Sequence, residues 1–416
     1  MTIWILCQYA GSLRHGMNYR PYFFGREFMT AGHRVVVVSG AYSHQFVEAP
    51  RTTGRYTLEI IDGLQYVWVK VPRYSGSSDP KRILSWCFYS VAVPGLAKLD
   101  LPKPDAIVVS SPVPYPIWPA VRLARRFEAV LAFDVRDIWP LSLTALGGYS
   151  TRHPFIRLTQ AAEDFAYQRS DLVTSAMPGA LEHMAGRGLD PAKFEWISNG
   201  IDPDLLENGD PFDPETEAAL EGDGLHLCYA GSFHARNTAA VFVEAAVLLQ
   251  ERGVPFTMWF VGKDAGGKDS LVDLARDRGC DNIHFLDPIK RSSMQALLAR
   301  MDICLAATRN SPLYRYGISL TKMFDYMLAG KPVVLSTGAD VDTVTSGGFG
   351  IVSPPEDPVG AAEAIMSIAA MDMKSRVAMG ARGRKVLLSE YTYKVLARRW
   401  LDRIERLCRC QGDTDG

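Results

Sequence analysis

The sequence predicts an α/β protein with two doubly wound domains, and three observations carry this prediction. The chain has 416 residues, which is too many for one ordinary core and suits two domains of about 200 residues each. Short apolar runs rich in β-branched residues alternate with helical stretches in both halves, as is typical of parallel strands buried on both faces. The segment 202–223 between the halves is rich in Asp, Glu, Pro and Gly, which indicates a linker.

Five apolar runs in each half are expected to form strands. In the first half the apolar runs are residues 3–7, 35–39, 107–109, 130–133 and 172–174, with a helix near 22–31. In the second half they are residues 225–230, 256–261, 283–286, 303–306 and 332–335. We therefore expect one domain at 1–202 and another at 203–392, with an amphipathic helix at 393–407 packing back on the first. Two such Rossmann-like domains are expected to face each other across a cleft, with ligands at the carboxyl ends of the strands.

Composition excludes several classes of protein. Lys and Arg number 45 against 46 Asp and Glu, so the chain lacks the basic footprint of a nucleic-acid binder. No apolar run reaches the roughly 18 residues that span a bilayer, and residues 3–7 are too short for a secretory signal. The seven cysteines form no CxxC pair, which favours buried thiols in a reducing compartment over a metal site. We therefore expect a cytoplasmic protein without a metal.

The most informative segment is 314–336, where a glycine turn precedes a helix and a valine-rich strand. We expect Ser319 or Thr321 to cap this helix, whose free N–H groups and positive dipole end form a diphosphate site that needs no metal. Lys322 adds a charge in the first turn, and the Asp325 carboxylate lies one turn further on, where it can accept two ribose hydroxyls. The residues expected around the nucleotide here are Gly317, Ile318, Ser319, Leu320, Thr321 and Asp325. The alternative is a capped helix with a solvated Lys and Asp.

This segment resembles the donor-binding segment of glycosyltransferase family 4, in which two glutamates in an E-x7-E pattern precede a Gly-Pro turn and a valine-rich strand. Residues 329–334 fix the alignment, so that Asp325 matches the second acid and Gly317 takes the place of the first. A branch of the family that builds bacterial surface polysaccharides is similar, with YGIS and K-x-FDYM in place of the glutamates. The resemblance implies the GT-B architecture.

A second segment, 227–233, joins a strand to a glycine turn and a helix. The backbone at Gly231 and Ser232 can approach a phosphate, and Arg236 can pair with it; a plain βα turn explains the same residues. In the resembling family this is the phosphate-facing loop, and Lys263 ends a strand similar to one near the nucleotide.

The first half adds candidates on the acceptor side. The resemblance implies that the loop 11–20, with Gly16 at the family's glycine position, closes over the donor phosphates and the acceptor. Asp134 and Arg136 either pair with each other or serve the site. Asp137, near a histidine of many relatives, is the expected contact to the transferred sugar or acceptor. Residues 199–202 match the NG-[VI]-D signature at the domain junction.

The resemblance implies a retaining glycosyltransferase that moves a hexosyl or N-acetylhexosaminyl group from a nucleotide sugar and requires no cofactor. UDP is the family's usual nucleotide, and GDP and ADP are the alternatives. The leaving diphosphate takes the acceptor proton, so no dedicated base is expected. The expected catalytic contributors are Lys322, Arg236 and Asp137, with the helix start at 319–321 binding the leaving group. The product belongs to O-antigen, capsule or exopolysaccharide synthesis.

The acceptor is indicated by residues 81–94, where basic residues precede Trp86, Phe88 and Tyr89. This pattern suits a helix on an anionic membrane, and a buried amphipathic helix explains it equally well. The membrane face would extend over residues 19–26, including Arg20. On this reading the acceptor is a lipid-linked saccharide at the inner face of a bacterial membrane.

Three other functions compete with glycosyl transfer. A dehydrogenase requires G-x-G-x-x-G after the first strand, and Gly11 and Gly16 lack that spacing. A nucleotide-sugar epimerase shares the two-domain architecture. A catalytically silent nucleotide-sugar-binding subunit is the non-enzyme alternative, because the first acid of the family pattern is absent.

Overall fold

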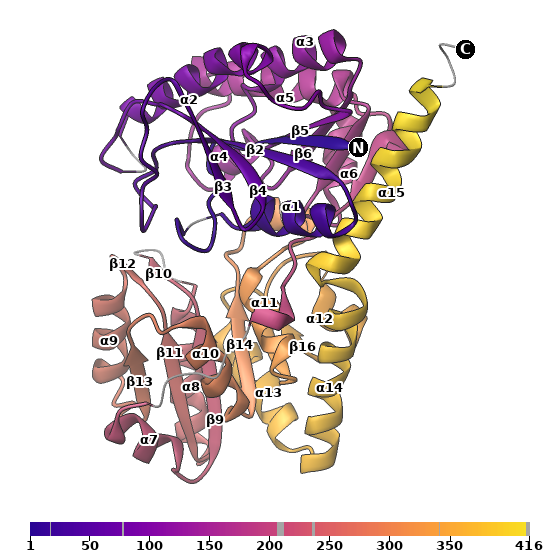
Figure 1. Ribbon diagram of the computed structural model, residues 1–416. Coiled ribbons are helices and arrows are strands. Elements are labelled where there is room, and N and C mark those ends of the chain that lie inside the picture. The colour runs from indigo at the N-terminus through magenta and orange to yellow at the C-terminus, as the bar shows by residue number, and fades with distance from the viewer. Residues whose placement is uncertain (17, 77–78, 206–211, 235–237, 341, 413–416) are drawn as a thin grey trace. The chain divides into compact units, whose positions relative to one another are not determined.

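The computed structural model describes residues 1–16, 18–76, 79–205, 212–234, 238–340 and 342–412. The chain forms two compact units, one of Met1–Gly200 with Tyr393–Gly416 and one of Ile201–Thr392. Each unit contains its own sheet of mainly parallel strands with helices around it (Figure 1). The α/β prediction with two Rossmann-like domains is confirmed.

The first unit contains an eight-stranded sheet in the order β3-β4-β2-β1-β5-β6-β7-β8. Its strands are β1 (Thr2–Leu6), β2 (Arg34–Gly40), β3 (Tyr56–Ile61), β4 (Leu64–Val69), β5 (Ala106–Ser110), β6 (Val130–Val135), β7 (Leu172–Ser175) and β8 (Phe194–Trp196). All neighbours pair in parallel except β3 and β4, which form an antiparallel hairpin. The hairpin was not predicted, although Asp62 and Gly63 form its turn, both with positive φ, and Asp-Gly is a strong hairpin signal.

Helices cover both faces of this sheet (Figure 1). The helices are α1 (Arg20–Thr30), α2 (Lys81–Ala92), α3 (Ile117–Phe127), α4 (Leu141–Ala145), α5 (Pro154–Arg169), α6 (Ala180–Gly186) and α15 (Tyr393–Gly412), with 3-10 turns η1 (Val93–Lys98) and η2 (Pro191–Lys193). The C-terminal helix α15 packs against α1, where the Phe23 ring stacks on Tyr393 at 4.7 Å and Phe24 meets Trp400 at 4.9 Å. These aromatic contacts join the C-terminal helix to the first unit.

The second unit contains a six-stranded parallel sheet in the order β13-β11-β9-β14-β15-β16. Its strands are β9 (Leu225–Ala230), β11 (Phe256–Val261), β13 (Ile283–Leu286), β14 (Ile303–Ala307), β15 (Val333–Ser336) and β16 (Gly350–Ser353). Two short strands, β10 (Phe233–His234) and β12 (Asp264–Ala265), pair separately. The apolar core of this unit lies between the sheet and the helices α8 and α13.

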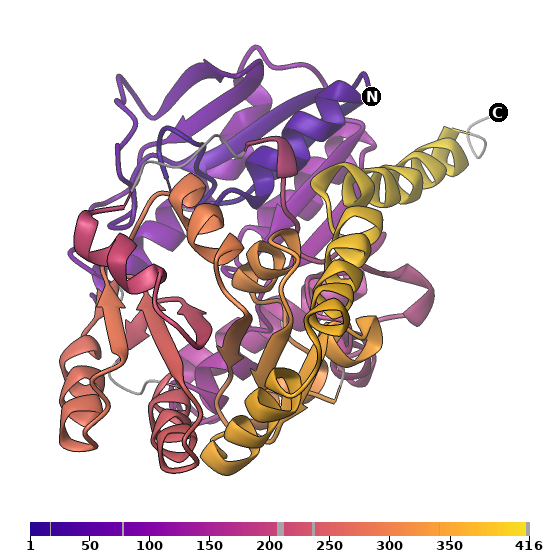
Figure 2. The same cartoon turned by 90° about the horizontal axis from the view of Figure 1, so that it is seen from below.

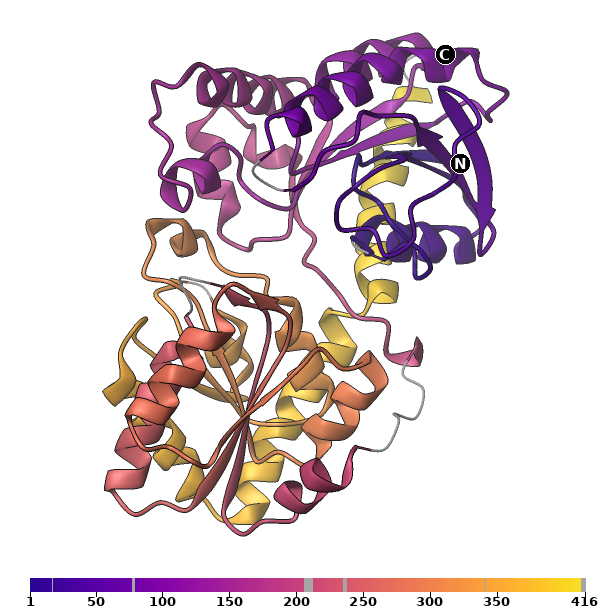
Figure 3. The ribbon, with the colours of Figure 1, turned by 90° about the vertical axis from the view of Figure 1, so that its left-hand side faces the viewer.

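The helices of the second unit are α7 (Pro214–Leu220), α8 (Ala240–Glu251), α9 (Lys268–Asp277), α10 (Arg291–Ala299), α11 (Thr321–Leu328), α12 (Thr343–Gly347), α13 (Pro358–Ala369) and α14 (Met373–Glu390). Two 3-10 turns, η3 (Pro203–Leu205) and η4 (Pro312–Tyr316), complete the unit. Helix α8 packs against α13 and α9, while α11 packs against α14, so helices flank the sheet on both faces (Figures 2 and 3). Helix α11, between β14 and β15, carries the residues predicted to bind the nucleotide.

Candidate functional site

The order of strands in the second unit marks one edge of its sheet as the candidate ligand site. From β9 the chain continues to β11 and β13 on one side, whereas β14, β15 and β16 lie on the other. The neighbours β9 and β14 therefore form the topological switch point, where open parallel sheets bind ligands beyond the carboxyl ends. Gly231 directly follows β9, and α11 follows β14 after the turn η4.

Two glycines allow the chain to approach itself closely at this edge. A Cβ atom on Gly262 would lie 1.9 Å from the carbonyl oxygen of Gly231, and one on Gly231 would lie 2.6 Å from Nζ of Lys322. The N–H of Gly231 donates to the carbonyl of Val261 at 2.8 Å. Side chains at either glycine would fill the space at the ends of β9 and β11.

Lys322 places its ammonium group at the end of β9. Its Nζ atom lies 3.8 Å from the centroid of the Tyr229 ring, a distance at which a cation is attracted to an aromatic face. The side chain comes from the first turn of α11 and is partly buried. A positive charge is thus held next to the backbone of Gly231.

Tyr326, one turn after Lys322, fixes α11 against the sheet. Its hydroxyl accepts a hydrogen bond from the N–H of Ala230 at 2.8 Å and donates to the carbonyl of Leu305 at 2.9 Å. Burial raises its pKa well above the ordinary value, so the hydroxyl stays neutral and can donate. Sequence reasoning missed this residue, although the i, i+4 spacing from Lys322 puts both side chains on one helix face.

The start of α11 differs from the expectation. Its N-cap is Leu320, in extended conformation, and no side chain caps the helix. The expected cap by Ser319 or Thr321 is wrong, because Leu320 occupies the cap position and has no polar side-chain atom. Gly317 ends η4 with φ of +88° and donates its N–H to the carbonyl of Tyr314. The helix start therefore keeps backbone N–H groups that no side chain caps, which favours an anion.

The other predicted residues of the second unit lie around this edge. Ile318 and Ser319 lie in the half-buried segment between η4 and α11. The Asp325 carboxylate faces Gln295 of α10, whose Nε2 lies 3.4 Å from Oδ1 and 3.2 Å from the Asp325 carbonyl. Ser232 and Lys263 are exposed. Arg236 lies outside the described residues.

In the first unit, the switch point lies between β1 and β5, and the loop after β1 holds Gly16. Gly16 has a positive φ of +75°, and a Cβ atom there would lie 2.8 Å from the Val47 side chain, so glycine is needed. Within the loop, the buried His15 ring nitrogen Nδ1 lies 2.8 Å from Oγ of Ser12. Burial lowers the pKa of His15, and its ring packs on Trp68 at 4.8 Å.

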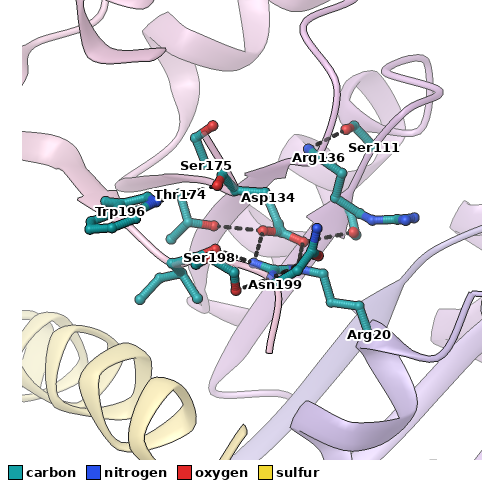
Figure 4. Close-up of polar contacts among 12 residues, drawn as sticks. Arg20, Ser111, Asp134, Arg136, Thr174, Ser175, Trp196, Ser198 and Asn199 are labelled. Atoms are coloured by element: carbon teal, nitrogen blue, oxygen red, sulfur yellow. Dashed lines mark hydrogen bonds and ion pairs between the residues drawn. The ribbon is translucent and has the colours of Figure 1, made fainter. Parts of the chain in front are cut away.

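A buried ion pair lies beside this loop (Figure 4). The guanidinium of Arg20 contacts both carboxylate oxygens of Asp134, with Nη2–Oδ1 at 2.9 Å and Nε–Oδ2 at 3.1 Å. Ser110 and Thr174 also donate to Asp134, at 2.8 and 2.9 Å. Burial raises the pKa of Asp134, but the opposing charge and hydrogen bonds of Arg20 prevail and hold it below the ordinary value.

Arg20 also holds the chain near the end of the first unit, since its nitrogens donate to the carbonyls of Ile197 at 2.8 Å and Ser198 at 2.6 Å (Figure 4). Two expectations are corrected here. Among the described residues Asp134 pairs with Arg20 and not with Arg136, and Arg20 belongs to the core and not to a membrane face. Its neighbours Tyr22, Phe23 and Phe24 are buried as well.

Arg136 and Asp137 remain at the carboxyl end of β6. The N–H of Arg136 donates to Oγ of Ser111 at 2.8 Å, and Nε of Arg136 has no hydrogen-bond partner in the part of the chain that the structure describes. Desolvation raises the pKa of the Asp137 carboxyl, yet the side chain is exposed. Because solvent reaches this carboxylate, we expect it to be charged at neutral pH. One interpretation of the sequence paired Arg136 with Asp134, but in the structure Arg20 is the partner of Asp134.

Comparison with known proteins found a family model that matches each unit. Residues 16–200 match the model described as "Glycosyl transferase 4-like domain", and residues 224–371 match "Glycosyl transferases group 1". The chain is a glycosyltransferase. Each model lies within one of the two units. A comparison with curated proteins found no match.

Solved structures of low identity show that this glycosyltransferase has the GT-B fold. A sucrose-phosphate synthase from Thermosynechococcus elongatus is 16% identical, with a TM-score of 0.71 over 98% of this chain and 99% of that one. An E. coli structure described as trehalose-6-phosphate bound with UDP-2-fluoro glucose is 13% identical, with a TM-score of 0.68 over 97% and 99%. Anabaena HepE in complex with UDP and glucose is 13% identical, with a TM-score of 0.63 over 97% and 99%.

The part of the chain that the structure describes contains no group of three or more His, Cys, Asp or Glu side chains placed to hold a metal ion. None of the helices in the described ranges has both the length and the apolar character to cross a membrane.

Proposed function

We propose that this glycosyltransferase binds a nucleoside diphosphate sugar, with UDP as the nucleotide, at the carboxyl edge of the second unit's sheet and transfers the sugar with retention of configuration. The acceptor is a saccharide or lipid-linked saccharide in the synthesis of a bacterial surface polysaccharide, such as O-antigen, capsule or exopolysaccharide. The enzyme works in the cytoplasm, in peripheral contact with the inner face of the membrane, and requires neither a cofactor nor a metal.

The observation that carries the donor assignment is the Lys322 ammonium held against the Gly231 backbone, next to a helix start that no side chain caps. In glycosyl transfer the anomeric C–O bond to the diphosphate breaks and negative charge builds on the leaving group, while the sugar approaches an oxocarbenium ion. Fixed donors aimed at the developing charge stabilise that state. These donors are proposed to be the Lys322 ammonium, the N–H groups at residues 318–322 and Arg236. The Asp325 carboxylate is proposed to accept hydrogen bonds from the ribose hydroxyls.

The nucleotide and the biological role rest on different support. UDP is favoured because two of the similar structures are described with UDP or a UDP-sugar. The surface-polysaccharide role is favoured by the YGIS and FDYM segments around Gly317 and Asp325, which resemble that branch of the family.

In the proposed reaction, the acceptor hydroxyl forms the new bond on the face from which the diphosphate leaves, and its proton passes to the diphosphate oxygen. No side-chain base is needed for this step. Asp137 is exposed at the end of β6 and is proposed to contact a hydroxyl of the transferred sugar or the acceptor. Arg136 adds a cation whose Nε lacks a partner among the described residues and suits an oxygen-rich substrate.

Turnover of a panel of UDP-, GDP- and ADP-sugars, with and without EDTA, tests the function when products are separated and identified by NMR. Transfer of one sugar to a saccharide or lipid-linked acceptor, with the donor's anomeric configuration kept, is the expected result. Conversion of the donor alone into an isomer would make the enzyme an epimerase. Nucleotide-sugar binding without any conversion would indicate a silent binding subunit, and loss of turnover in EDTA would contradict the metal-free reaction.

A further inference from the structure

Helix α2 turns an apolar face toward solvent. Five positions on one side of the helix are exposed, and none is charged: Ile83, Leu84, Cys87, Phe88 and Val91. The exposed fractions of the largest reach 53% for Leu84, 56% for Phe88 and 69% for Val91. A helix on the surface of a soluble domain normally directs its polar side outward. These five side chains, the α2 apolar face, therefore point to a partner.

The opposite side of α2 is buried, and its polar atoms are hydrogen-bonded to other parts of the first unit. The Trp86 indole N–H donates to the Tyr9 hydroxyl at 2.6 Å, and Nε of Arg82 donates to the same oxygen at 3.1 Å. Ser85 accepts from Nε2 of Gln8 at 3.0 Å. Since rotating the helix to bury its apolar face would break these bonds, the exposure of that face is built into the fold.

Two hollows extend the apolar surface on either side of the helix. One, of about 750 Å³, is lined by Phe88, Val91 and Cys87 of α2 together with Val71 and Pro72. The other, of about 420 Å³, lies between α2, α3 and α5, and its lining includes Trp118, Phe155 and Leu158. Figure 1 shows α2, α3 and α5 on the same face of this unit. The α2 apolar face is thus the centre of a wider apolar surface.

The charged side chains that line the two hollows are cations, while at the start of α2 the Asp79 carboxylate lies beside Lys81. Arg55 and Lys70 line the larger hollow and Arg122 the smaller one, and Lys81 is exposed at the start of α2. Among the described lining residues of the two hollows there is no Asp or Glu. Apolar side chains edged by cations match the boundary between acyl chains and anionic headgroups.

We propose that α2 docks this enzyme on an anionic membrane surface, with the α2 apolar face entering the bilayer boundary and Arg55, Lys70, Lys81 and Arg122 contacting headgroups. The docking proposal assigns a surface to the membrane contact included in the proposed function, and it rests on the proposed function for the identity of the acceptor. Gln8 and Tyr9, which hold the inner side of α2, lie in the loop that follows β1 at the switch point. Docking therefore holds the acceptor edge of the first unit next to the surface in which a lipid-linked acceptor lies.

Sedimentation with vesicles tests the docking surface. The full chain is spun with vesicles of phosphatidylcholine alone and of phosphatidylcholine with phosphatidylglycerol, at low and high salt. We expect binding to the anionic vesicles that weakens as salt screens the rim cations. The double variant Leu84→Asp with Phe88→Asp should bind them roughly tenfold more weakly or worse. The matched control Val377→Asp, 59% exposed on α14, should bind as the wild type does.

A fluorescent label on Cys87, which is exposed within the α2 apolar face, gives a second measurement in a Cys410→Ser background. Its emission should shift to shorter wavelength on the anionic vesicles and stay unchanged on phosphatidylcholine alone. Because the replaced side chains are exposed, the variants should unfold at the same temperature as the wild type. If the double variant unfolds at a lower temperature, Val91→Asp replaces it in the vesicle test.

Three outcomes would overturn the proposal: no binding of the wild type to anionic vesicles, full binding by the double variant, or a dimer in solution that the double variant makes monomeric. The last result would show that a second copy of the chain covers the α2 apolar face. Nucleotide binding by the same samples, measured without vesicles, shows separately whether the proposed donor site has failed.

Discussion

Replacement of Lys322 by alanine removes the positive charge that we expect to contribute most to diphosphate binding at the donor site. Nζ of this side chain lies over the Tyr229 ring at 3.8 Å and next to the Gly231 backbone. A diphosphate bound at the end of β9 would meet this ammonium directly. The variant should therefore bind UDP and UDP-sugars more weakly, with little effect on the fold.

The magnitude follows from the partial burial of Lys322. Two unit charges about 4 Å apart attract by about 4 kcal/mol at an effective dielectric constant near 20. Solvent already offsets part of that attraction at a half-exposed group, and a hydrogen bond to a charged partner contributes about 1.5–3 kcal/mol net. Since about 1.4 kcal/mol corresponds to tenfold in Kd, we expect affinity for UDP to fall roughly 10- to 150-fold.

Isothermal titration of wild type, Lys322→Ala and the exposed control Lys385→Ala with UDP, UMP and uridine measures this effect. The loss should be large for UDP, smaller for UMP and near zero for uridine, because only the phosphates meet the ammonium. The control should match the wild type. Affinity for UDP within twofold of the wild type in Lys322→Ala would refute the reasoning.

Three further predictions concern residues of both units. Asp325→Ala should weaken UDP-sugar binding by roughly tenfold, about 1.4 kcal/mol, and unchanged affinity would remove this residue from the site. Arg20→Met leaves the Asp134 carboxylate buried without its partner and should destabilise the protein by about 3–5 kcal/mol in urea unfolding. The folded pKa of Asp134 lies below its unfolded value. Its contribution to the free energy of unfolding is therefore present above about pH 4 and is lost as the pH falls through the folded pKa. Because Arg20→Met removes this contribution, the pH midpoint of acid unfolding should rise. Arg136→Gln should lower the rate of transfer while UDP affinity stays unchanged, and equal loss of both would contradict its place on the acceptor side.

Strands such as β9, β11 and β13 were predictable because each is a mainly apolar run. Residues 225–230, 256–261 and 283–286 coincide with β9, β11 and β13, because strands buried on both faces are apolar at most positions. His226, Thr257 and His284 are the exceptions. The hairpin of β3 and β4 was missed because Thr57 and Glu59 interrupt the apolar run in β3 and Gln65 interrupts it in β4.

The site was only partly predictable, because sequence patterns report neighbours along the chain and not partners in space. Asp134 was given a choice of partner two residues away, whereas its partner Arg20 is 114 residues distant. The hydrogen bonds of Tyr326 to β9 and β14 have the same long-range character. The sequence could not show that the apolar face of α2 is exposed to solvent. The spacing of its residues identifies an apolar face of the helix but does not show whether that face points to the core or to solvent.

The most direct test of the central claim is a thermal-shift panel of UDP, GDP and ADP on the wild type and Lys322→Ala, with and without EDTA. The account predicts that one nucleoside diphosphate raises the unfolding temperature of the wild type by several degrees, equally in EDTA, and that Lys322→Ala loses most of this shift. No shift with any of the three on a folded sample would contradict a nucleotide site at the end of β9.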